Sequence, residues 1–520
     1  MNTLDLKKTY LGIELGSTRI KAVLTDDTFS PVAEGFFEWE NDFKNGYFTY
    51  SLESIHRGVK ECFKSLSDNL YAGYGTRPAS FGAIGISGMM HGYLAFDEND
   101  SLLTPFRTWR NTTTAEATDR LSDAFGMNIG QRWSISHLYQ AILNNEEHIT
   151  KIAHITTLAG YIHYLLTGRW ELGVCDASGM FPVSEGEYDK EKLEIFARMI
   201  SAFDLPWKLE NILPRVRLAG EDGAVLTKDG ARFLDPTGTL LPGVPLCPPE
   251  GDAGTGMVAT NSVAPGTGNV SAGTSVFSML VLKKALEKRY SFVDTVSTPN
   301  GAPVAMVHCN NCSGELDFWV NIFDELTSLF GAKQDRSTLY NKLYNHALTG
   351  DSRGIIAYNY LSGEHATDIS SGKPMCFRFP DTKVNLAGFM RSQLFSSIAT
   401  LSLGMKTLLE KEGVKADNLC AHGGLFKVKG VAQRLLASAV DSPVSVTEAA
   451  GEGGAWGMAL LAAYMVNKNE CPLDKWLDES VFAGISSDTV SPDKALADEF
   501  DDYLCYYKKG LEGERILGEI

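Results

Sequence analysis

The sequence predicts an α/β fold built from two related domains, and three observations carry this prediction. Short apolar runs bounded by glycine turns alternate with stretches of helical periodicity, as strands and helices do. A Gly-[Ser/Thr]-[Ser/Thr] turn between two strand-like runs occurs twice, at Gly16 and at Gly273. The chain of 520 residues is also longer than one ordinary domain, because a domain typically holds about 100–200 residues.

The first domain opens with three strand-like runs joined by tight turns, at Tyr10–Glu14, Ile20–Thr25 and Pro31–Glu40. Helical periodicity then extends over Ser51–Leu70, with Ser51 as a suitable N-cap, and an apolar strand follows at Phe81–Ser87. Three strands, a helix and a further strand is the order typical of a ribonuclease-H-like α/β unit.

The second half repeats the hairpin and then becomes mostly helical. Further strands are expected at Gly268–Ala272, Val276–Leu282 and Leu419–His422, and helices at Phe395–Glu412, Val431–Val440 and Gly453–Val466. The more polar tail after Asn467 is expected to form surface helices. The two short hairpins alone leave duplication open.

The segment Leu241–Thr260 is rich in glycine and proline, which is typical of a crossover between domains. We therefore predict one domain over residues 1–258 and a second over residues 259–520.

Composition excludes several classes of protein. The net charge is −17 and there is no Lys/Arg run, so no basic footprint for nucleic acid exists. Residues 1–10 lack the apolar core of a secretory signal, and the apolar stretch Met458–Val466 is about half the ~20 residues of a membrane span. We expect a cytoplasmic enzyme with a small-molecule substrate, no nucleic-acid or membrane partner, and a homodimeric assembly.

Cys309 and Cys312 form a C-x-x-C motif among nine cysteines. A structural zinc site normally needs a second such pair, and a redox motif a thioredoxin-like context. The favoured interpretation is reduced, structural or substrate-adjacent thiols, with a redox or metal function as the alternative.

The two glycine turns are candidate phosphate sites. Glycine lets the backbone approach an oxygen closely, and successive N–H groups with Ser/Thr hydroxyls donate to it. Each turn alone also fits an ordinary hairpin, but two of them flanking one cleft favour phosphate binding. The sequence contains no G-x-x-x-x-G-K-[ST] motif, which disfavours a P-loop mechanism.

Asp252 lies among small residues in Gly251-Asp-Ala-Gly-Thr-Gly256. Small neighbours would let a hydroxyl and a phosphate reach its carboxylate, so Asp252 is a candidate general base. An N-cap for the segment 254–259 is the equally weighted alternative.

Four weaker motifs each have a structural alternative. Gly423-Gly424 after a strand and Gly451–Ala455 before a helix suit an adenosine, or tight packing of helix on strand. His91, in Met89-Met-His-Gly92, can donate to sugar hydroxyls or be a satisfied core histidine. Asp176, in Asp-Ala-Ser-Gly179, fits a site or a structural turn.

Taken together, these motifs resemble the FGGY family of carbohydrate kinases, and within it the xylulokinase branch most closely. The resemblance extends from about Tyr10 to about Met465 with the motifs in the family order. The matching segments are Leu11–Thr18, Ser87–Gly92, Trp109–Asn111, Asp176–Gly179, Gly251-Asp252, Ser271–Ser275, Tyr360–Glu364 and Gly423-Gly424.

The resemblance implies two ribonuclease-H-like (actin/hexokinase-type) domains flanking a deep catalytic cleft, with sugar on the N-terminal side, ATP on the C-terminal side and Mg²⁺ as a further cofactor. It implies Asp252 as catalytic base and, with Glu14, as metal ligand. The implied sugar-binding residues are Met90, His91, Gly92, Trp109, Asn111 and Asp252. The implied nucleotide-binding residues are Gly16, Ser17, Thr18, Lys21, Gly273, Thr274, Ser275, Gly423, Gly424 and Lys427.

Four positions depart from the family pattern. Glu14 replaces an aspartate, Met89 a glutamine and Asn111 an aspartate, and His137 lies where many relatives have lysine. Met89, Asn111 and His137 fall on the sugar side. The resemblance therefore predicts the kinase activity more firmly than the identity of the sugar. A ketopentose such as xylulose is expected, with another ketose or a polyol (a 6-deoxyketose, ribulose, a glycerol-like acceptor) as alternatives. A sugar-independent actin-like ATPase and a non-catalytic sugar- or nucleotide-binding regulator are the alternatives from other classes.

Overall fold

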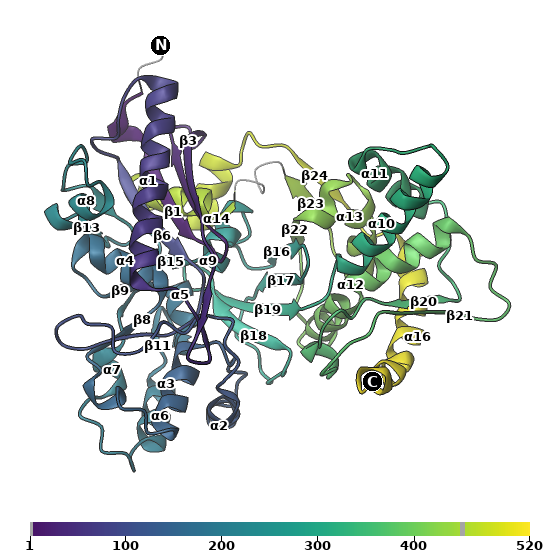
Figure 1. The fold of residues 1–520 in the computed structure, drawn as a ribbon, viewed down its shortest axis with the longest axis horizontal. Coiled ribbons are helices and arrows are strands. Elements are labelled where there is room, and N and C mark those ends of the chain that lie inside the picture. Colours follow the sequence, from purple (N-terminus) through teal and green to yellow (C-terminus); the bar gives the residue numbers. More distant parts are fainter. Residues whose placement is uncertain (1–3, 448–452) are drawn as a thin grey trace. The chain divides into compact units, whose positions relative to one another are not determined.

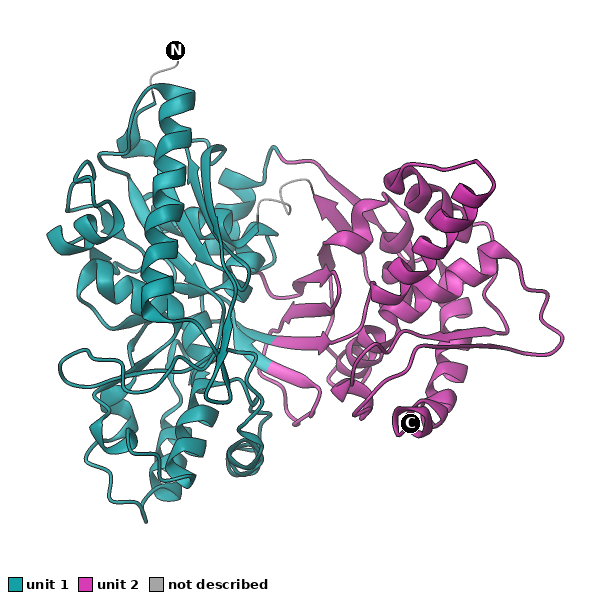
Figure 2. Ribbon diagram, viewed as in Figure 1, with its two compact units in different colours: residues 1–263, 295–304, 452–484 teal, residues 264–294, 305–451, 485–520 magenta. Residues whose placement is uncertain are grey.

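A computed structural model describes residues 4–447 and 453–520 of the chain. Two compact units are distinguished in Figure 2. Unit 1 comprises Met1–Val263, Thr295–Val304 and Glu452–Gly484, and unit 2 comprises Ala264–Asp294, Ala305–Gly451 and Ile485–Ile520. The units therefore differ from two contiguous segments divided at residue 258, because the chain returns twice to unit 1.

Unit 1 is built on a seven-stranded sheet of order β13-β14-β6-β1-β2-β3, with β15 also paired to β6 (Figure 1). Strands β1 (Tyr10–Leu15), β2 (Arg19–Thr25) and β3 (Pro31–Glu38) form an antiparallel meander. Strand β6 (Ala83–Gly88) is parallel to β1. These bounds confirm the strands predicted in this region to within two residues.

Helices cover both faces of this sheet because successive strand residues point to opposite sides. On one face α1 (Leu52–Tyr74) packs so closely that a Cβ at Gly35 would lie 2.4 Å from the carbonyl oxygen of Cys62. On the other, α14 (Gly453–Asn467) packs on β1, where a Cβ at Gly12 would lie 2.0 Å from the carbonyl oxygen of Ala455. Ser51 caps α1 as predicted, accepting from the Ser54 N–H.

The glycine- and proline-rich segment Leu241–Thr260 lies in unit 1, just before the chain enters unit 2 at Ala264. It contains β14 (Pro245–Leu246), β15 (Glu250–Gly251) and α9 (Asp252–Ala259), all within unit 1. Its small residues serve close packing. A Cβ at Gly254 of α9 would lie 2.7 Å from Cys175 Sγ.

Unit 2 repeats the central arrangement of unit 1. Strands β16 (Thr267–Ala272) and β17 (Val276–Val281) form an antiparallel hairpin, and β22 (Asn418–His422) pairs parallel to β16, as β6 pairs to β1. The sheet continues through β23 (Val444–Thr447) to β24 (Ser487–Val490). The common topology supports the predicted duplication and confirms the α/β class.

One helix of unit 2 is longer than the sequence predicted. Helix α12 (Leu386–Lys411) begins nine residues before the predicted Phe395, whereas α13 (Val431–Val440) has its predicted bounds. The C-terminal α16 (Lys494–Gly518) is a surface helix as expected, but its apolar face buries Phe500, Tyr503, Leu504 and Tyr507 in the core of unit 2. No helix among the described residues is long and apolar enough to cross a membrane.

Candidate active site

The carboxyl ends of three neighbouring strands bring the candidate residues of unit 1 together. The register places Glu14 of β1 beside Ser87 of β6, and Ser87 beside Glu250 of β15. The chain leaves this edge into the first glycine turn, into Met89–Gly92, and into α9 with Asp252 in its first turn. Ligands of open α/β sheets bind at such an edge.

In the first glycine turn, two backbone carbonyl oxygens accept hydrogen bonds from aromatic side chains. Trp39 Nε1 donates to the Gly16 carbonyl oxygen at 2.8 Å and the Tyr50 hydroxyl to that of Ser17 at 2.5 Å. Among the described residues, the N–H groups of Ser17 and Thr18 have no hydrogen-bond partner. The turn therefore presents donors and not acceptors, as an anion site requires.

Asp252 is held by backbone donors at the start of α9. Its Oδ1 accepts from the Met90 N–H at 3.2 Å, and the N-cap of the helix is Gly251, so the N-cap interpretation of Asp252 is wrong. Burial raises the pKa of Asp252, while backbone hydrogen bonds from Met90 and Ala253 and the charge of Arg132 act in the opposite direction.

Glu14 lies at the N-terminus of α14, where the Ala455 N–H bonds to it. Burial, and then the charge of Asp252, raise the pKa of Glu14 to about 7, against the lowering effect of Ala455 and Lys21. A Cβ at Gly454 would lie 2.8 Å from Glu14 Oε2. Gly454 thus provides close packing rather than an adenosine surface, and Gly451 and Glu452 lie outside the described residues.

A second pair of carboxylates lies directly behind Asp252. The Asp176 N–H donates to Glu250 Oε2 at 2.9 Å, and Thr157 Oγ1 donates to Asp176 Oδ2 at 2.6 Å. Asp176 Oδ1 and Glu250 Oε1 have no partner among the described residues. Burial raises the pKa of Asp176 to about 7, with Asp252 adding to the rise. Asp176, in helix α5 (Val174–Ser178), thus lies close enough to Asp252 for the two charges to interact.

Asp176 gives a prediction for stability against pH. Its pKa is near 3.8 when unfolded and about 7 when folded, so the folded state retains a proton that the unfolded state has lost. The free energy of unfolding should therefore fall as pH rises from about 4 to 7, by a few kcal/mol at most. Urea unfolding of Asp176→Asn should show a flatter pH profile than wild type, and the exposed control Asp204→Asn should not. Parallel profiles for all three proteins would contradict the assignment.

The residues after β6 form the remaining wall of the unit 1 site. His91 has a φ of 70°, bonds through Nδ1 to the Gly179 carbonyl oxygen at 3.0 Å, and stacks on Trp133 with ring centroids 5.9 Å apart. A Cβ at Gly92 would lie 2.9 Å from the Arg107 carbonyl oxygen. Only glycine is therefore accommodated there.

Two candidates lie in the loop after Arg107. Trp109 is 39% exposed and donates from Nε1 to Ser17 Oγ at 3.1 Å, so it joins this loop to the first glycine turn. Asn111 is buried; its Oδ1 accepts from the Phe48 N–H, and its Nδ2 donates to the carbonyl oxygens of Phe48 and Thr108. The structure thus gives Asn111 a loop-holding function that the sequence did not indicate.

Lys21 and His137 complete the sequence-predicted positions in unit 1. Lys21 lies opposite Glu14 on β2 and forms an ion pair with Glu34 at 3.0 Å. His137, on α3 (Ser134–Leu143), is buried against Tyr93, and burial lowers its pKa to about 3. It is therefore neutral at physiological pH.

The second glycine turn and Gly423 meet at the carboxyl edge of the unit 2 sheet. The register pairs Ser271 of β16 with His422 of β22, and Gly423 follows with a φ of 102°. A Cβ at Gly423 would lie 2.3 Å from the Ala272 carbonyl oxygen. Gly424 has nothing within 4 Å of such an atom, and Lys427 is exposed in the short helix η4 (Gly424–Lys427). A small cavity of about 130 Å³ adjoins this helix.

The C-x-x-C segment braces the second glycine turn. The Cys312 N–H donates to the Thr274 carbonyl oxygen at 2.9 Å, and Ser313 Oγ to that of Gly273 at 2.7 Å. Both thiols are free, and burial raises the pKa of Cys309 and of Cys312. This arrangement supports a structural function for the pair. No group of three or more His, Cys, Asp or Glu side chains suited to a metal occurs among the described residues.

Glu364 accepts hydrogen bonds from the backbone next to the C-x-x-C segment, and this arrangement gives a second prediction. Its Oε2 accepts from the N–H groups of Asn310 at 2.7 Å and Asn311 at 3.4 Å. Glu364→Gln should loosen the bracing of Gly273 and raise the KM for the nucleotide severalfold, with little change in the KM for the acceptor. The exposed control Glu325→Gln should change neither constant. Equal effects on both KM values would indicate general destabilisation instead.

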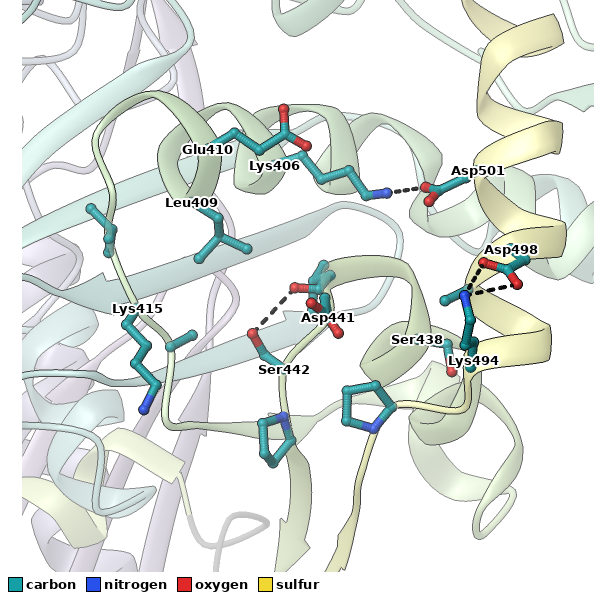
Figure 3. A pocket seen from close by; sticks show the side chains of 16 residues that line it. Lys406, Leu409, Glu410, Lys415, Ser438, Asp441, Ser442, Lys494, Asp498 and Asp501 are labelled. Atoms are coloured by element: carbon teal, nitrogen blue, oxygen red, sulfur yellow. Dashed lines mark hydrogen bonds and ion pairs between the residues drawn. The ribbon is translucent and has the colours of Figure 1, made fainter.

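Sequence reasoning missed Arg132, Thr157 and Glu250, because no local motif marks them and only the fold brings them to Asp252 or Asp176. A separate hollow of about 810 Å³ in unit 2 is shown in Figure 3. It is lined by the loops that precede β22 and β23, at the opposite edge of the sheet from Gly423. Its lysines Lys406, Lys415 and Lys494 are paired with Asp501, Asp417 and Asp498, respectively.

Comparison with known proteins agrees with this geometry. The N-terminal domain model of the FGGY family of carbohydrate kinases matches residues 9–252, and its C-terminal domain model matches residues 268–466. A xylulose kinase of Haemophilus influenzae is 22% identical over 471 residues, covering 86% of this chain and 89% of that protein.

Two solved structures share the fold. The xylulose kinase of Rhodospirillum rubrum superposes with a TM-score of 0.78 at 16% identity, covering 97% of this chain and 99% of that one. The glycerol kinase of Plasmodium falciparum, solved with ADP, gives a TM-score of 0.74 at 14% identity, covering 97% and 98%. The chain belongs to the FGGY family of carbohydrate kinases.

Proposed function

We propose that the protein transfers the γ-phosphoryl group of ATP to a hydroxyl of a ketopentose, with xylulose as the first candidate. The observation that carries the proposal is the placement of Asp252 beside Met90 and behind a glycine turn that presents only donors. The name of the curated relative supports a xylulose-like acceptor. Structural neighbours that are named glycerol kinase and gluconate kinase keep another ketose or a polyol as the alternative.

In this proposal Asp252 is the general base. The Met90 N–H occupies Oδ1, so Oδ2 is the oxygen that takes the proton of the attacking hydroxyl. Burial makes the carboxylate a stronger base than an exposed aspartate, because it raises the pKa. Backbone hydrogen bonds from Met90 and Ala253, and then the charge of Arg132, act against this rise.

Phosphate oxygens are proposed to be held by the two glycine turns. Ser17 and Thr18 supply N–H groups in unit 1, and Thr274 and Ser275 supply N–H and hydroxyl donors beside Gly273 in unit 2. Fixed donors of this kind stabilise developing charge without reorganisation. The remaining proposed nucleotide contacts are Gly16, Lys21, Gly423, Gly424 and Lys427.

The residues present fit a Mg²⁺ ion. Glu14 and Asp252 are two carboxylates whose mutual repulsion contributes to the raised pKa of Glu14, and a divalent cation would relieve that repulsion. Mg²⁺ is usually bound by one or two carboxylates together with substrate phosphates and waters. When bound, it would neutralise charge on the transferred phosphoryl group. Glu14 and Asp252 are the proposed ligands.

The proposed sugar contacts are Met90, His91, Gly92 and Trp109, with Asp252 at the reacting hydroxyl. Asn111 is retained as a sugar-side candidate that acts by holding the Trp109 loop. A homodimer is proposed as the assembly.

The substrate class is tested by measuring ADP release from Mg·ATP with ketopentoses, ketohexoses, 6-deoxyketoses and alditols. We expect turnover with one class, highest for a ketopentose. ADP release that does not depend on sugar would instead support an ATPase, and nucleotide binding with no turnover would support a regulator.

A further inference from the structure

A buried arginine, Arg107, lies next to the two segments of unit 1 that are proposed to contact the sugar. Its side chain is 2% exposed, which is too little for contact with a ligand. Its backbone forms an antiparallel bridge with Tyr93: the Tyr93 N–H donates to the Arg107 carbonyl oxygen at 2.8 Å, and the Arg107 N–H donates to that of Tyr93 at 3.1 Å. The bridge joins the segment that contains His91 and Gly92 to the loop that carries Trp109.

The loop that carries Trp109 has little regular structure to hold it in place. Residues 103–114 form neither a helix nor a strand. The position of such a loop depends on its own hydrogen bonds and side-chain contacts, because no helix or sheet ladder fixes it. Trp109 and Asn111 make contacts of this kind, and the guanidinium of Arg107 adds an ionic one.

The guanidinium of Arg107 contacts three parts of unit 1 at once. Its Nη2 donates to Glu146 Oε2, in the turn that follows α3. Its Cζ also lies over the rings of Tyr47, in β5 (Tyr47–Thr49), and of Tyr93, at 4.4 Å and 5.5 Å from their centroids. Arginine suits this place because its planar group can stack on aromatic rings while its N–H groups bond to a carboxylate.

His148 closes these contacts into a ring. Its Nδ1 lies 3.4 Å from Glu146 Oε2, and its Nε2 lies 2.9 Å from the Tyr93 hydroxyl. Burial lowers the pKa of His148 to about 4, against the raising effect of Glu146 and with the further lowering effect of Arg107. The imidazole is therefore neutral near pH 7 and has one N–H.

The carboxylate decides where the N–H of His148 lies. The ion-paired carboxylate of Glu146 can only accept, so Nδ1 carries the hydrogen and the Tyr93 hydroxyl donates to Nε2. A continuous set of contacts then leads from Arg107 through Glu146, His148 and Tyr93 back to the backbone of Arg107. We call these four residues the Arg107 network.

The Arg107 network fits a positioning function better than a stabilising one. A buried ion pair contributes little net stability, because the loss of water from two charges offsets their attraction, and apolar side chains of similar size often replace such a pair without loss. The hydrogen bonds of a planar guanidinium are directional, however. They fix where the loop lies, which apolar contacts would do less exactly.

We propose that Arg107 is a positioning residue for the sugar acceptor. Through the Arg107 network it holds His91 and Gly92, and with them Trp109, in the relative positions in which they bind the sugar. This inference rests on the proposed function, because that proposal assigns His91, Gly92 and Trp109 to the sugar. It adds that the affinity for the acceptor depends on a side chain that does not touch it.

The proposal is tested with the double variant Arg107→Met/Glu146→Leu, which removes both charges together and leaves no unpaired ion. The control is Arg77→Met. Arg77 likewise lies over a tyrosine ring, 5.1 Å from the centroid of Tyr71, and donates to Asp68 at 3.1 Å, but it is exposed and lies outside the network. Urea unfolding and steady-state kinetics are measured for both variants and for wild type.

We expect the double variant to unfold near the wild-type midpoint and to have a KM for the sugar at least about tenfold higher, because small displacements of positioning groups have effects of this size. The KM for ATP should change much less, and the control should keep wild-type constants. Tyr93→Phe, which removes only the hydroxyl bonded to His148, should raise the KM for the sugar by a smaller factor. An unchanged KM for the sugar in both network variants would overturn the proposal. A similar rise in both KM values would also overturn it, because it would indicate a general effect on unit 1.

Amide hydrogen exchange tests the same arrangement without turnover. The amide hydrogens of Tyr93 and Arg107 are bonded to each other's carbonyl groups, and in both network variants they should exchange at least about tenfold faster than in wild type. The amides of β17 in unit 2 should not change. Unchanged exchange at Tyr93 and Arg107 would overturn the positioning proposal. Failure of the proposed function would appear separately, as a wild type without sugar-dependent turnover.

Discussion

Asp252→Asn should lower kcat by about 10²–10⁴-fold, the usual contribution of a positioned general base. The substitution keeps the size of the side chain and an oxygen to accept from the Met90 N–H, so the geometry of the loop is preserved. What is lost is the group that takes the hydroxyl proton. Affinity for sugar, measured by calorimetry, should change much less than kcat.

The matched control is Asp229→Asn. Asp229 is also a carboxylate in the first turn of a short helix, α8 (Lys228–Leu234), but it is exposed and lies outside the site. We expect unchanged kinetics. An Asp252→Asn protein that folds and turns over at a tenth of the wild-type rate or faster would show that another group accepts the proton.

Gly423→Ala should impair nucleotide binding and stability together. The added Cβ would lie 2.3 Å from the Ala272 carbonyl oxygen, at a φ of 102° that alanine rarely adopts. Strain of this kind costs about 1–3 kcal/mol, and relief of the clash must move the strand that leads into the second glycine turn. Displacing positioning groups by about 1 Å can reduce rate up to about a hundredfold.

We therefore expect the KM for ATP to rise at least about tenfold, with the KM for sugar nearly unchanged. Gly413→Ala provides the control, because Gly413 has a φ of 61° in the same unit but nothing within 4 Å of an added Cβ. It should lose stability without any change in the KM for ATP. An equal rise for both variants would show that backbone strain, and not the Gly423 contact, is responsible.

Local chemistry made part of this site predictable from sequence. The glycine turns at Gly16 and Gly273 need only short strands on either side, and Asp252 stands out because its neighbours are small. The strands of the first meander alternate clearly, so their bounds agree closely with the structure.

Features that depend on distant segments were not predictable in the same way. The chain returns to unit 1 with α14. Only this return brings Gly454 into contact with Glu14. The side-chain amide of Asn111 is hydrogen-bonded to the backbone of Phe48, which lies far away in sequence. Segments rich in glycine and proline normally lie at a surface, but Gly254 in Leu241–Thr260 packs closely against Cys175.

The burial of α16 was open to prediction. Phe500, Tyr503, Leu504, Tyr507 and Leu511 recur at helical spacing, and this periodicity indicates an apolar face. The remaining positions of α16 are highly charged, which led to the expectation of a polar surface helix. Charged residues, however, mark only the exposed face of an amphipathic helix.

The central claim, phosphoryl transfer from ATP to a sugar, is tested most directly by phosphorus NMR of a complete reaction with the best acceptor. The account predicts one sugar phosphate for each ADP formed, no reaction without sugar, and neither product with Asp252→Asn on the same timescale. Inorganic phosphate as the main product, with or without sugar, would contradict it.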